Sequence, residues 1–171
     1  MLSIVQDPQK LWAHIEITPE CGPVKYEFDA RFGLVVDRFL RTPMHYPLPY
    51  GYIANTLAED GDALDILVMV PSAIMPTSWI QVRPVAVLVM EDEKGMDQKI
   101  LAVPINAVSH LYDNIQNISD VPQDLLDRIT DFFLYYKTRD SDKWSKVHDF
   151  LDVEHAYAII AETIARYNSV N

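Results

Sequence analysis

Three aspartates lie close together in segment 58–66, which reads Ala-Glu-Asp-Gly-Asp-Ala-Leu-Asp-Ile. Asp60, Asp62 and Asp65 fall between two apolar, strand-like stretches, and Gly61 allows a sharp backbone turn between them. Two carboxylates about 4 Å apart repel each other by roughly 4 kcal/mol at an effective dielectric constant of about 20, so a fold that gathers three of them needs a reason. A bound divalent cation is the usual one, because hard ions such as Mg2+ take oxygen ligands and invert the local charge.

The same residues also fit a simpler structure. An Asp-Gly-Asp sequence is common in surface turns, where the carboxylates are only solvated. An EF-hand calcium loop is excluded by a direct check: with Asp60 at its first position, Leu64 falls where Asp or Asn is required and Asp65 replaces the required Gly. The aspartates therefore indicate either a solvated turn or a metal site in another framework.

A second acidic group surrounds a turn at residues 91–97 and consists of Glu91, Asp92, Glu93 and Asp97. By itself this group is also compatible with a charged hairpin tip. Basic residues elsewhere are interleaved with tyrosines, and such donors without an obvious nucleophile are what a phosphate pocket requires. These donors are Lys25, Arg38, Tyr46, Tyr50, Tyr136, Lys137 and Lys143. The sequence contains neither a Walker-type phosphate loop nor a Rossmann glycine fingerprint.

The composition restricts the partners and the compartment. A chain of 171 residues suits one domain, which we place over residues 1–171. The formal net charge of −11 argues against nucleic acid or an anionic membrane as a partner, but not against an anionic substrate bound through metal ions. The sequence has no apolar run long enough for a membrane span and no signal peptide, and its one cysteine, Cys21, fits a reducing cytoplasm.

The first two-thirds of the chain is typical of short strands and the last third of helices. Strands are predicted over 12–17, 24–29, 34–38, 64–70, 80–90 and 98–103. Pro84 indicates an edge or a bulge within its strand. Apolar residues at helical spacing predict one helix over 125–136 and a second from Asp152 onward. Strands followed by segregated helices favour an α+β fold, with an antiparallel sheet or small barrel and helices packed outside it.

Alternation in 24–29 assigns the two faces of that strand. Val24, Tyr26 and Phe28 are expected to point inward, and Lys25 and Glu27 to share the other face. Because they share a face, Lys25 and Glu27 can both point into one pocket.

The turn of aspartates resembles the signature of the soluble family I inorganic pyrophosphatases, Asp-x-Asp-Pro-x-Asp followed by an apolar residue, with Ala63 where the family usually has Pro. We identify the chain as a member of this family, of the bacterial type. The similarity runs from about residue 12 to about residue 150. Its further matches, in the family order, are Glu16-Ile17, Lys25-Tyr26-Glu27, Val36-Asp37-Arg38-Phe39, Tyr46-Pro47, Tyr50-Gly51-Tyr52, Asp92-Glu93, Asp97, Lys99, Tyr136-Lys137 and Lys143-Trp144.

The resemblance implies a fold, a reaction and an assembly. The fold is a five-stranded OB-like β-barrel with flanking α-helices and a site at the mouth of the barrel. The reaction is Mg2+-dependent hydrolysis of inorganic pyrophosphate to two orthophosphates by a metal-bridged hydroxide, with several Mg2+ ions per active site. The chain is thus expected to be an inorganic diphosphatase. Bacterial relatives of this length commonly form hexamers, so a cytoplasmic homohexamer is expected.

The resemblance also implies roles for individual residues. The metal ligands would be Glu27, Asp60, Asp65, Asp92 and Asp97. The phosphoryl oxygens would be bound by Lys25, Arg38, Tyr50, Lys99, Tyr136 and Lys137. Supporting positions would be held by Glu16, Tyr46, Glu93 and Lys143. Asp62 would be the general base, since it is the one carboxylate of the signature without an inferred primary metal role.

Two other classes of protein stay open at this point. A non-catalytic OB-like module that binds single-stranded nucleic acid needs a basic groove with stacking aromatic residues, which the acidic balance opposes. A Ca2+-stabilised interaction protein would gain thermal stability with Ca2+ but would release no phosphate.

Overall fold

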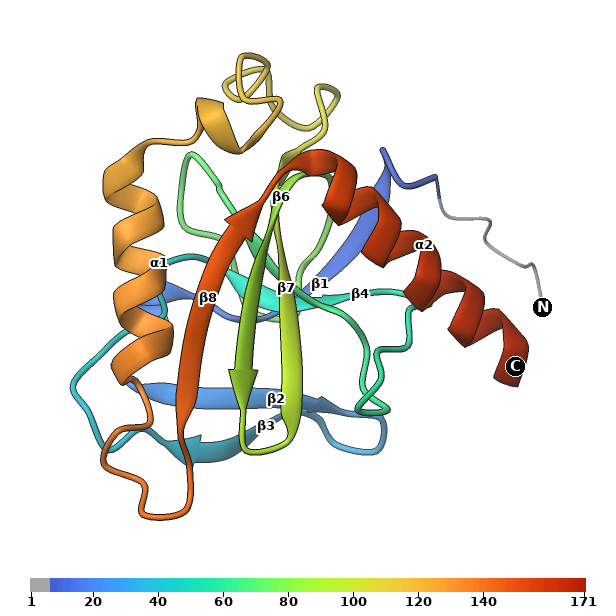
Figure 1. Ribbon diagram of the computed structural model, residues 1–171. Helices are drawn as coiled ribbons and strands as arrows, with labels where there is room; N and C mark the ends of the chain where they lie inside the picture. The colour runs from blue at the N-terminus through green and yellow to red at the C-terminus, as the bar shows by residue number, and fades with distance from the viewer. Residues whose placement is uncertain (1–6) are drawn as a thin grey trace.

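The computed structural model describes residues 7–171, and five of its strands close into a barrel (Figure 1). These strands are β1 (Leu11–Ile17), β4 (Tyr50–Ile53), β5 (Asp65–Val68), β6 (Trp79–Asp92) and β7 (Gly95–Pro104). They follow one another in the order β1-β4-β5-β7-β6, and β6 pairs back to β1, which closes the ring. β5 and β7 run parallel, whereas the other pairs in the ring are antiparallel. The predicted five-stranded OB-like barrel is confirmed.

Within the described residues, three further strands and two helices surround the barrel. β8 (Ser145–Leu151) extends the sheet beyond β6, and β2 (Val24–Asp29) pairs with β3 (Gly33–Phe39) in a separate hairpin. In Figure 1 the hairpin lies below the barrel, with α1 (Gln123–Tyr135) on one side and α2 (Val153–Val170) on the other. Short 3-10 turns cover Pro19–Cys21 and Ile118–Asp120. No helix within residues 7–171 is long and apolar enough to cross a membrane.

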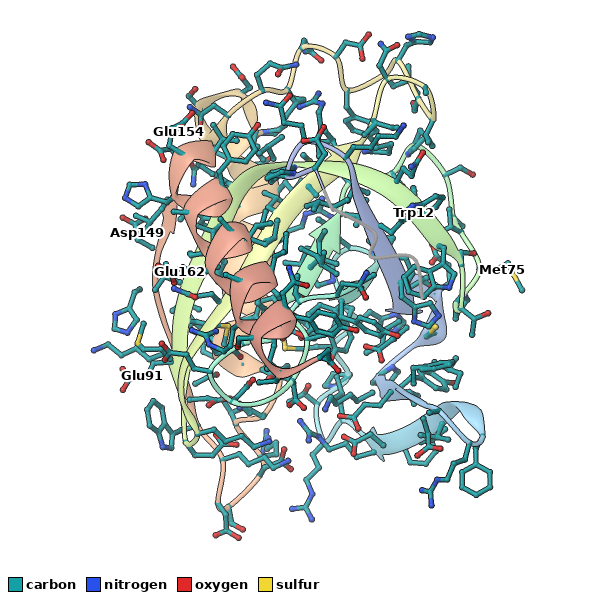
Figure 2. The ribbon with its side chains drawn as sticks, turned by 90° about the vertical axis from the view of Figure 1, so that its right-hand side faces the viewer. Trp12, Met75, Glu91, Asp149, Glu154 and Glu162 are labelled. Carbon is teal, nitrogen blue, oxygen red and sulfur yellow. The ribbon has the colours of Figure 1, made fainter. Side chains whose placement is uncertain are left out.

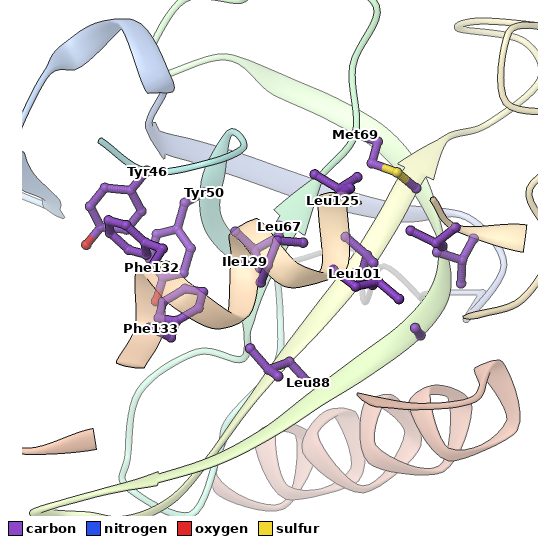
Figure 3. Close-up of a cluster of buried hydrophobic side chains, with 14 of the residues drawn as sticks. Tyr46, Tyr50, Leu67, Met69, Leu88, Leu101, Leu125, Ile129, Phe132 and Phe133 are labelled. Carbon is purple, nitrogen blue, oxygen red and sulfur yellow. The ribbon is translucent and has the colours of Figure 1, made fainter. Parts of the chain in front are cut away.

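Each helix seals one hydrophobic cluster against the barrel. The buried stripe of α1 packs on side chains from β4, β5, β6 and β7, as Figure 3 shows for Ile129, Leu67 and Leu101. The stripe of α2, with Ala156 and Ile160 fully buried, covers the other cluster. Both stripes have the helical spacing that the sequence predicted, because an amphipathic helix buries residues three and four positions apart. The helix predicted from Asp152 begins one residue later, and the Asp152 carboxylate caps it.

Some local predictions need correction. Neither β4 nor β8 was predicted: β4 has only four residues, and β8 is an edge strand in which polar side chains interrupt the apolar pattern. Phe28 does not point into a core, since it is 44% exposed. The hairpin is a separate two-stranded sheet, so only part of the inner face of β2 meets the core: Tyr26 packs against the cluster that α1 covers, as predicted, whereas Phe28 lines a cavity. Pro84 does lie at a bulge, where the register with β7 shifts.

Candidate active site

One cavity of about 560 Å³ opens at the end of the barrel that faces the β2–β3 hairpin. Its walls come from the hairpin, β4, the segment 58–66 that carries Asp60, Asp62 and Asp65 (the aspartate turn), the β6–β7 hairpin tip and the residues at the end of α1. Every residue for which the sequence predicted a role lines this cavity. They are Glu16, Lys25, Glu27, Arg38, Tyr46, Tyr50, Asp60, Asp62, Asp65, Asp92, Glu93, Asp97, Lys99, Tyr136, Lys137 and Lys143.

The aspartate turn is ordered by its own backbone. Gly61 has φ +91°, a conformation that L side chains rarely adopt. The N–H of Ala58 donates to the carbonyl of Asp62 at 2.7 Å, and the N–H of Asp62 donates to Oδ1 of Asp60 at 3.0 Å. At the strand side, the buried Thr56 hydroxyl accepts the N–H of Leu64 at 2.9 Å. The turn therefore presents the exposed Asp60 and Asp62 side chains to the cavity as one unit.

Lys99 forms the most buried charged cluster of the cavity. Its side chain is 3% exposed, and its Nζ lies 2.7 Å from Asp65, 3.1 Å from Asp97 and 3.0 Å from the hydroxyl of Tyr50. The Tyr50 hydroxyl in turn donates to Asp65 at 2.6 Å. Burial alone would lower the pKa of Lys99, but the neighbouring carboxylates hold it well above its ordinary value, so Lys99 stays protonated. Burial also raises the pKa of Asp97, against the opposing charge of Lys99.

Lys137 joins the end of α1 to the β6–β7 hairpin tip. Its Nζ lies 3.1 Å from Asp92 and 3.2 Å from Glu93, and Glu93 also accepts the N–H of Trp144 at 3.3 Å. Although burial raises the pKa of Asp92, the N–H of Lys94 and the Lys137 ammonium lower it overall. Asp92 is therefore held as a carboxylate at neutral pH.

The β2–β3 hairpin supplies two further cations, Lys25 and Arg38. Lys25 and Glu27 do share one face of β2, as predicted, and their side chains form an ion pair of 2.5 Å. Lys25 and Arg38 stand opposite each other in the hairpin, and both reach Asp37, at 3.3 and 3.5 Å. Nε of Arg38 is buried and has no hydrogen-bond partner among residues 7–171. A buried donor left unpaired in a cationic wall is suited to receive an oxyanion.

Glu16 and Tyr46 line the cavity and also hold its walls in place. Glu16 accepts the N–H of Phe28 at 2.7 Å and so ties β1 to the hairpin. Burial raises the pKa of Glu16 from its usual 4.5 to about 7, the charges of Asp65 and Glu27 add to this, and the bond from Phe28 opposes it. Tyr46 is 2% exposed, and its ring packs on those of Tyr50 and Phe132. This packing supports the Tyr50 ring, over which the Lys99 ammonium lies at 5.2 Å from the ring centre.

The donor set of the cavity fits divalent cations. In the described part of the chain, eight carboxylates but only six cationic side chains line it, and no Cys or His is among these lining residues. Hard ions such as Mg2+ prefer such all-oxygen donors. Within residues 7–171, however, no group of three or more acidic, His or Cys side chains is already gathered as a ligand set. Lysine ammonium groups instead form ion pairs with these carboxylates: Lys99 lies between Asp65 and Asp97, and Lys137 lies beside Asp92.

Sequence reasoning missed one charged residue of this cavity and one that stands behind its wall. Lys94 lines the cavity at the tip between β6 and β7, where its charge lowers the pKa of Asp62 against the larger effect of burial. Asp37 supports the hairpin cations. The position of Lys94 as the only base in the acidic segment 91–97 is the signal that could have identified it.

The barrel and its cavity of carboxylates and cationic donors agree with comparisons to known proteins. The family model described as inorganic pyrophosphatase matches residues 13–168. An inorganic pyrophosphatase of Vibrio parahaemolyticus is 47% identical over 160 residues, which cover 93% of this chain and 91% of that protein.

Solved structures give the same result. A crystal structure described as an inorganic phosphatase from Anaplasma phagocytophilum is 46% identical, with a TM-score of 0.92 and coverage of 97% of this chain and 98% of that one. The inorganic pyrophosphatase of Thermus thermophilus is 38% identical, with a TM-score of 0.90 and coverage of 96% and 95%. The chain belongs to the inorganic pyrophosphatase family. The enzyme class predicted from the sequence, an inorganic diphosphatase, is confirmed at the level of this family.

Proposed function

We propose that this protein hydrolyses inorganic pyrophosphate to two orthophosphates in a Mg2+-dependent reaction. The observation that carries the proposal is the wall of the cavity, in which the cationic and tyrosine donors alternate with carboxylates. A polyanionic substrate requires hydrogen-bond and cationic donors to bind it. The excess negative charge of the carboxylates requires metal cations to offset it. The family membership supports the same reaction.

The proposed Mg2+ ligands are Glu27, Asp60, Asp65, Asp92 and Asp97. Bound Mg2+ would supply a lowered pKa for water at the site and charge neutralisation for the phosphoryl oxygens. The oxygens of Asp65 and Asp97 lie 2.7 and 3.1 Å from the Lys99 ammonium, and this contact with a cation supports their assignment as ligands. Because the neighbouring carboxylates keep Lys99 protonated, its charge would be available to contact substrate.

Asp62 is the proposed general base. Its side chain faces the cavity from the exposed turn, and its backbone is fixed by the bonds to Ala58 and Asp60. Burial raises the pKa of Asp62, and the charge of Asp60 adds to the effect. A carboxylate with a raised pKa takes a proton more readily than an ordinary one, so Asp62 can accept the proton of the attacking water at a carboxylate oxygen.

The remaining donors bind the two phosphoryl groups. Lys25 and Arg38 line the hairpin wall, and the free Nε of Arg38 offers a donor to one oxygen. Lys99 and Tyr50 line the floor, and Lys137 closes the side near α1, next to Tyr136. Fixed donors on both phosphoryl groups stabilise the charge that moves to the leaving group, without reorganisation during the reaction.

The decisive experiment is a phosphate-release assay with pyrophosphate and, separately, ATP. We expect rapid release from pyrophosphate with Mg2+, much slower release from ATP, and loss of activity after exhaustive chelation. Activity that survives chelation, or the absence of release from pyrophosphate, contradicts the proposal.

We also propose that the protein acts in the cytoplasm as a homohexamer. Several large apolar side chains are exposed on the single chain, among them Phe32, Met75 and Trp79 at 75%, 76% and 50%. Exposed apolar side chains of this size are typical of contact surfaces between proteins. Size-exclusion chromatography with light scattering tests this assembly, and a monomeric mass contradicts it.

A further inference from the structure

The C-terminal helix is bonded to the chain immediately before the aspartate turn. Both backbone polar groups of Leu57 bond to α2: its N–H donates to the carbonyl of Thr163 at 3.0 Å, and its carbonyl accepts Nη1 of Arg166 at 2.8 Å. In Figure 1 the connection that follows β4 passes beside the C-terminal half of α2. Arg166 thus reaches across 109 positions of the sequence to one carbonyl.

Hydrogen bonds continue from this anchor into the turn. Ala58, the next residue, donates to the carbonyl of Asp62 at 2.7 Å and accepts the N–H of Gly61 at 3.2 Å. Asp62 is bonded in turn to the carboxylate of Asp60. A displacement of Leu57 would therefore move Asp60 and Asp62 together.

Side-chain packing gives the turn little support on the side of α2. A second cavity of about 210 Å³ lies there, lined by residues that include Ala58, Asp60, Ile159 and Arg166. Figure 2 views the molecule with α2 in front and labels Glu162, another residue that lines this cavity. A void offers no contacts that resist movement, so hydrogen bonds matter most at residues 58–62, whereas Leu64 at the end of the segment packs in the cluster that α2 covers.

The ion pair of Arg166 with Glu59 cannot replace the bond to the carbonyl. The two side chains are 3.9 Å apart, and that of Glu59 is 83% exposed. Pairs of this kind contribute little in water. The guanidinium acts mainly through the carbonyl of Leu57.

We propose that Arg166 is a positioning residue for the active site: it holds the carbonyl of Leu57 and thereby fixes Asp60 and Asp62 where one binds a metal and the other accepts a proton. The roles of Asp60 and Asp62 rest on the function proposed above. Loss of the anchor would let the turn move toward the second cavity, and displacements of about 1 Å can reduce catalysis by about 100-fold.

The test compares Arg166→Gln and Arg166→Lys with Arg128→Gln. Arg128 is exposed on α1 and lines neither cavity, so its substitution removes one positive charge without touching the turn. Two quantities are measured for each full-length protein. The first is the Mg2+ concentration that gives half of the maximal rise in melting temperature, and the second is the turnover of pyrophosphate at saturating Mg2+.

We expect Arg166→Gln to raise the Mg2+ midpoint about 10-fold, in line with the loss of other groups that orient metal ligands. Turnover should also fall, Arg166→Lys should be intermediate, and Arg128→Gln should match the wild type. A lower melting temperature with an unchanged Mg2+ midpoint and unchanged turnover would mean a purely structural role and overturn the proposal. If Arg166→Gln does not fold, Arg166→Lys decides by the same two measurements. A wild type that releases no phosphate would refute the proposed function alone, because the Mg2+ midpoint still tests the anchor.

Discussion

Nζ of Lys99 lies 2.7 Å from Oδ2 of Asp65, although the two residues are 34 positions apart in the chain. The parallel pairing of β5 and β7 places them directly opposite each other. The same ammonium also contacts Asp97, so one buried cation holds two of the proposed metal ligands. Lys99 thus stabilises the carboxylates before any metal binds.

The first prediction concerns this cluster. Lys99→Met should destabilise the metal-free protein by about 3 kcal/mol, because it leaves Asp65 and Asp97 without their cation. Mg2+ should stabilise the variant more than it stabilises the wild type, since the ion can take over the lost charge. Urea unfolding with and without Mg2+ measures both effects, and the exposed Lys146→Met is the control. A variant as stable as the wild type without Mg2+ contradicts the arrangement.

The second prediction concerns the general base. Asp62→Asn should lower the turnover of pyrophosphate by about 100- to 10,000-fold, the range that general acid–base catalysis contributes. The Mg2+-induced rise in melting temperature should stay close to that of the wild type, because Asp62 is not a proposed ligand. Asp131→Asn, an exposed change on α1, should leave both quantities unchanged. Turnover within a few-fold of the wild type would assign the base to another group.

The third prediction follows from the raised pKa of Glu16. Its pKa in the folded protein is about 7 against an ordinary 4.5, so the folded state holds the extra proton between these values. The free energy of unfolding of the metal-free protein should therefore fall as the pH rises from about 4.5 to about 7. Glu16→Gln keeps an acceptor for the N–H of Phe28 but cannot ionise.

The Gln variant should thus be more stable than the wild type at pH 8, by about 2 kcal/mol after allowance for solvent screening. The difference should vanish near pH 4. Urea unfolding of both proteins across this range, with chelator present, measures it. A constant difference at every pH would exclude ionisation of Glu16 as the cause.

The fourth prediction concerns the cation that the sequence did not reveal. Among residues 7–171, the ammonium of Lys94 has no carboxylate ion pair, so it is available to the substrate. Lys94→Ala should raise KM for pyrophosphate about 3- to 5-fold and leave kcat nearly unchanged, as expected for an exposed charge worth about 1 kcal/mol. The effect should weaken at high salt. Lys146→Ala, outside the cavity, is the control, and an equal effect there would point to general charge instead.

Residue type and order were enough to predict much of the fold and of the site. Apolar alternation and helical spacing predicted six strands and both helices, because those elements bury one face and leave the other in water. The signature aspartates, with the family matches around them, identified side chains that the structure gathers in one cavity. β4 was not predicted because it is short and contains Gly51, and glycine is depleted in strands. The structure requires glycine there, since Gly51 lies so close to the carbonyl of His14 that no side chain fits.

The sequence by itself determined the chemistry: an acidic chain with clustered carboxylates and interleaved Lys, Arg and Tyr donors. Only the tertiary structure decided which charges meet. Barrel closure set Lys99 between Asp65 and Asp97, and the end of α1 set Lys137 against Asp92. The anchor from Arg166 to Leu57 likewise exists only because α2 crosses the barrel. Such pairs depend on strand register and helix docking, which local sequence patterns do not encode because the partners are far apart along the chain.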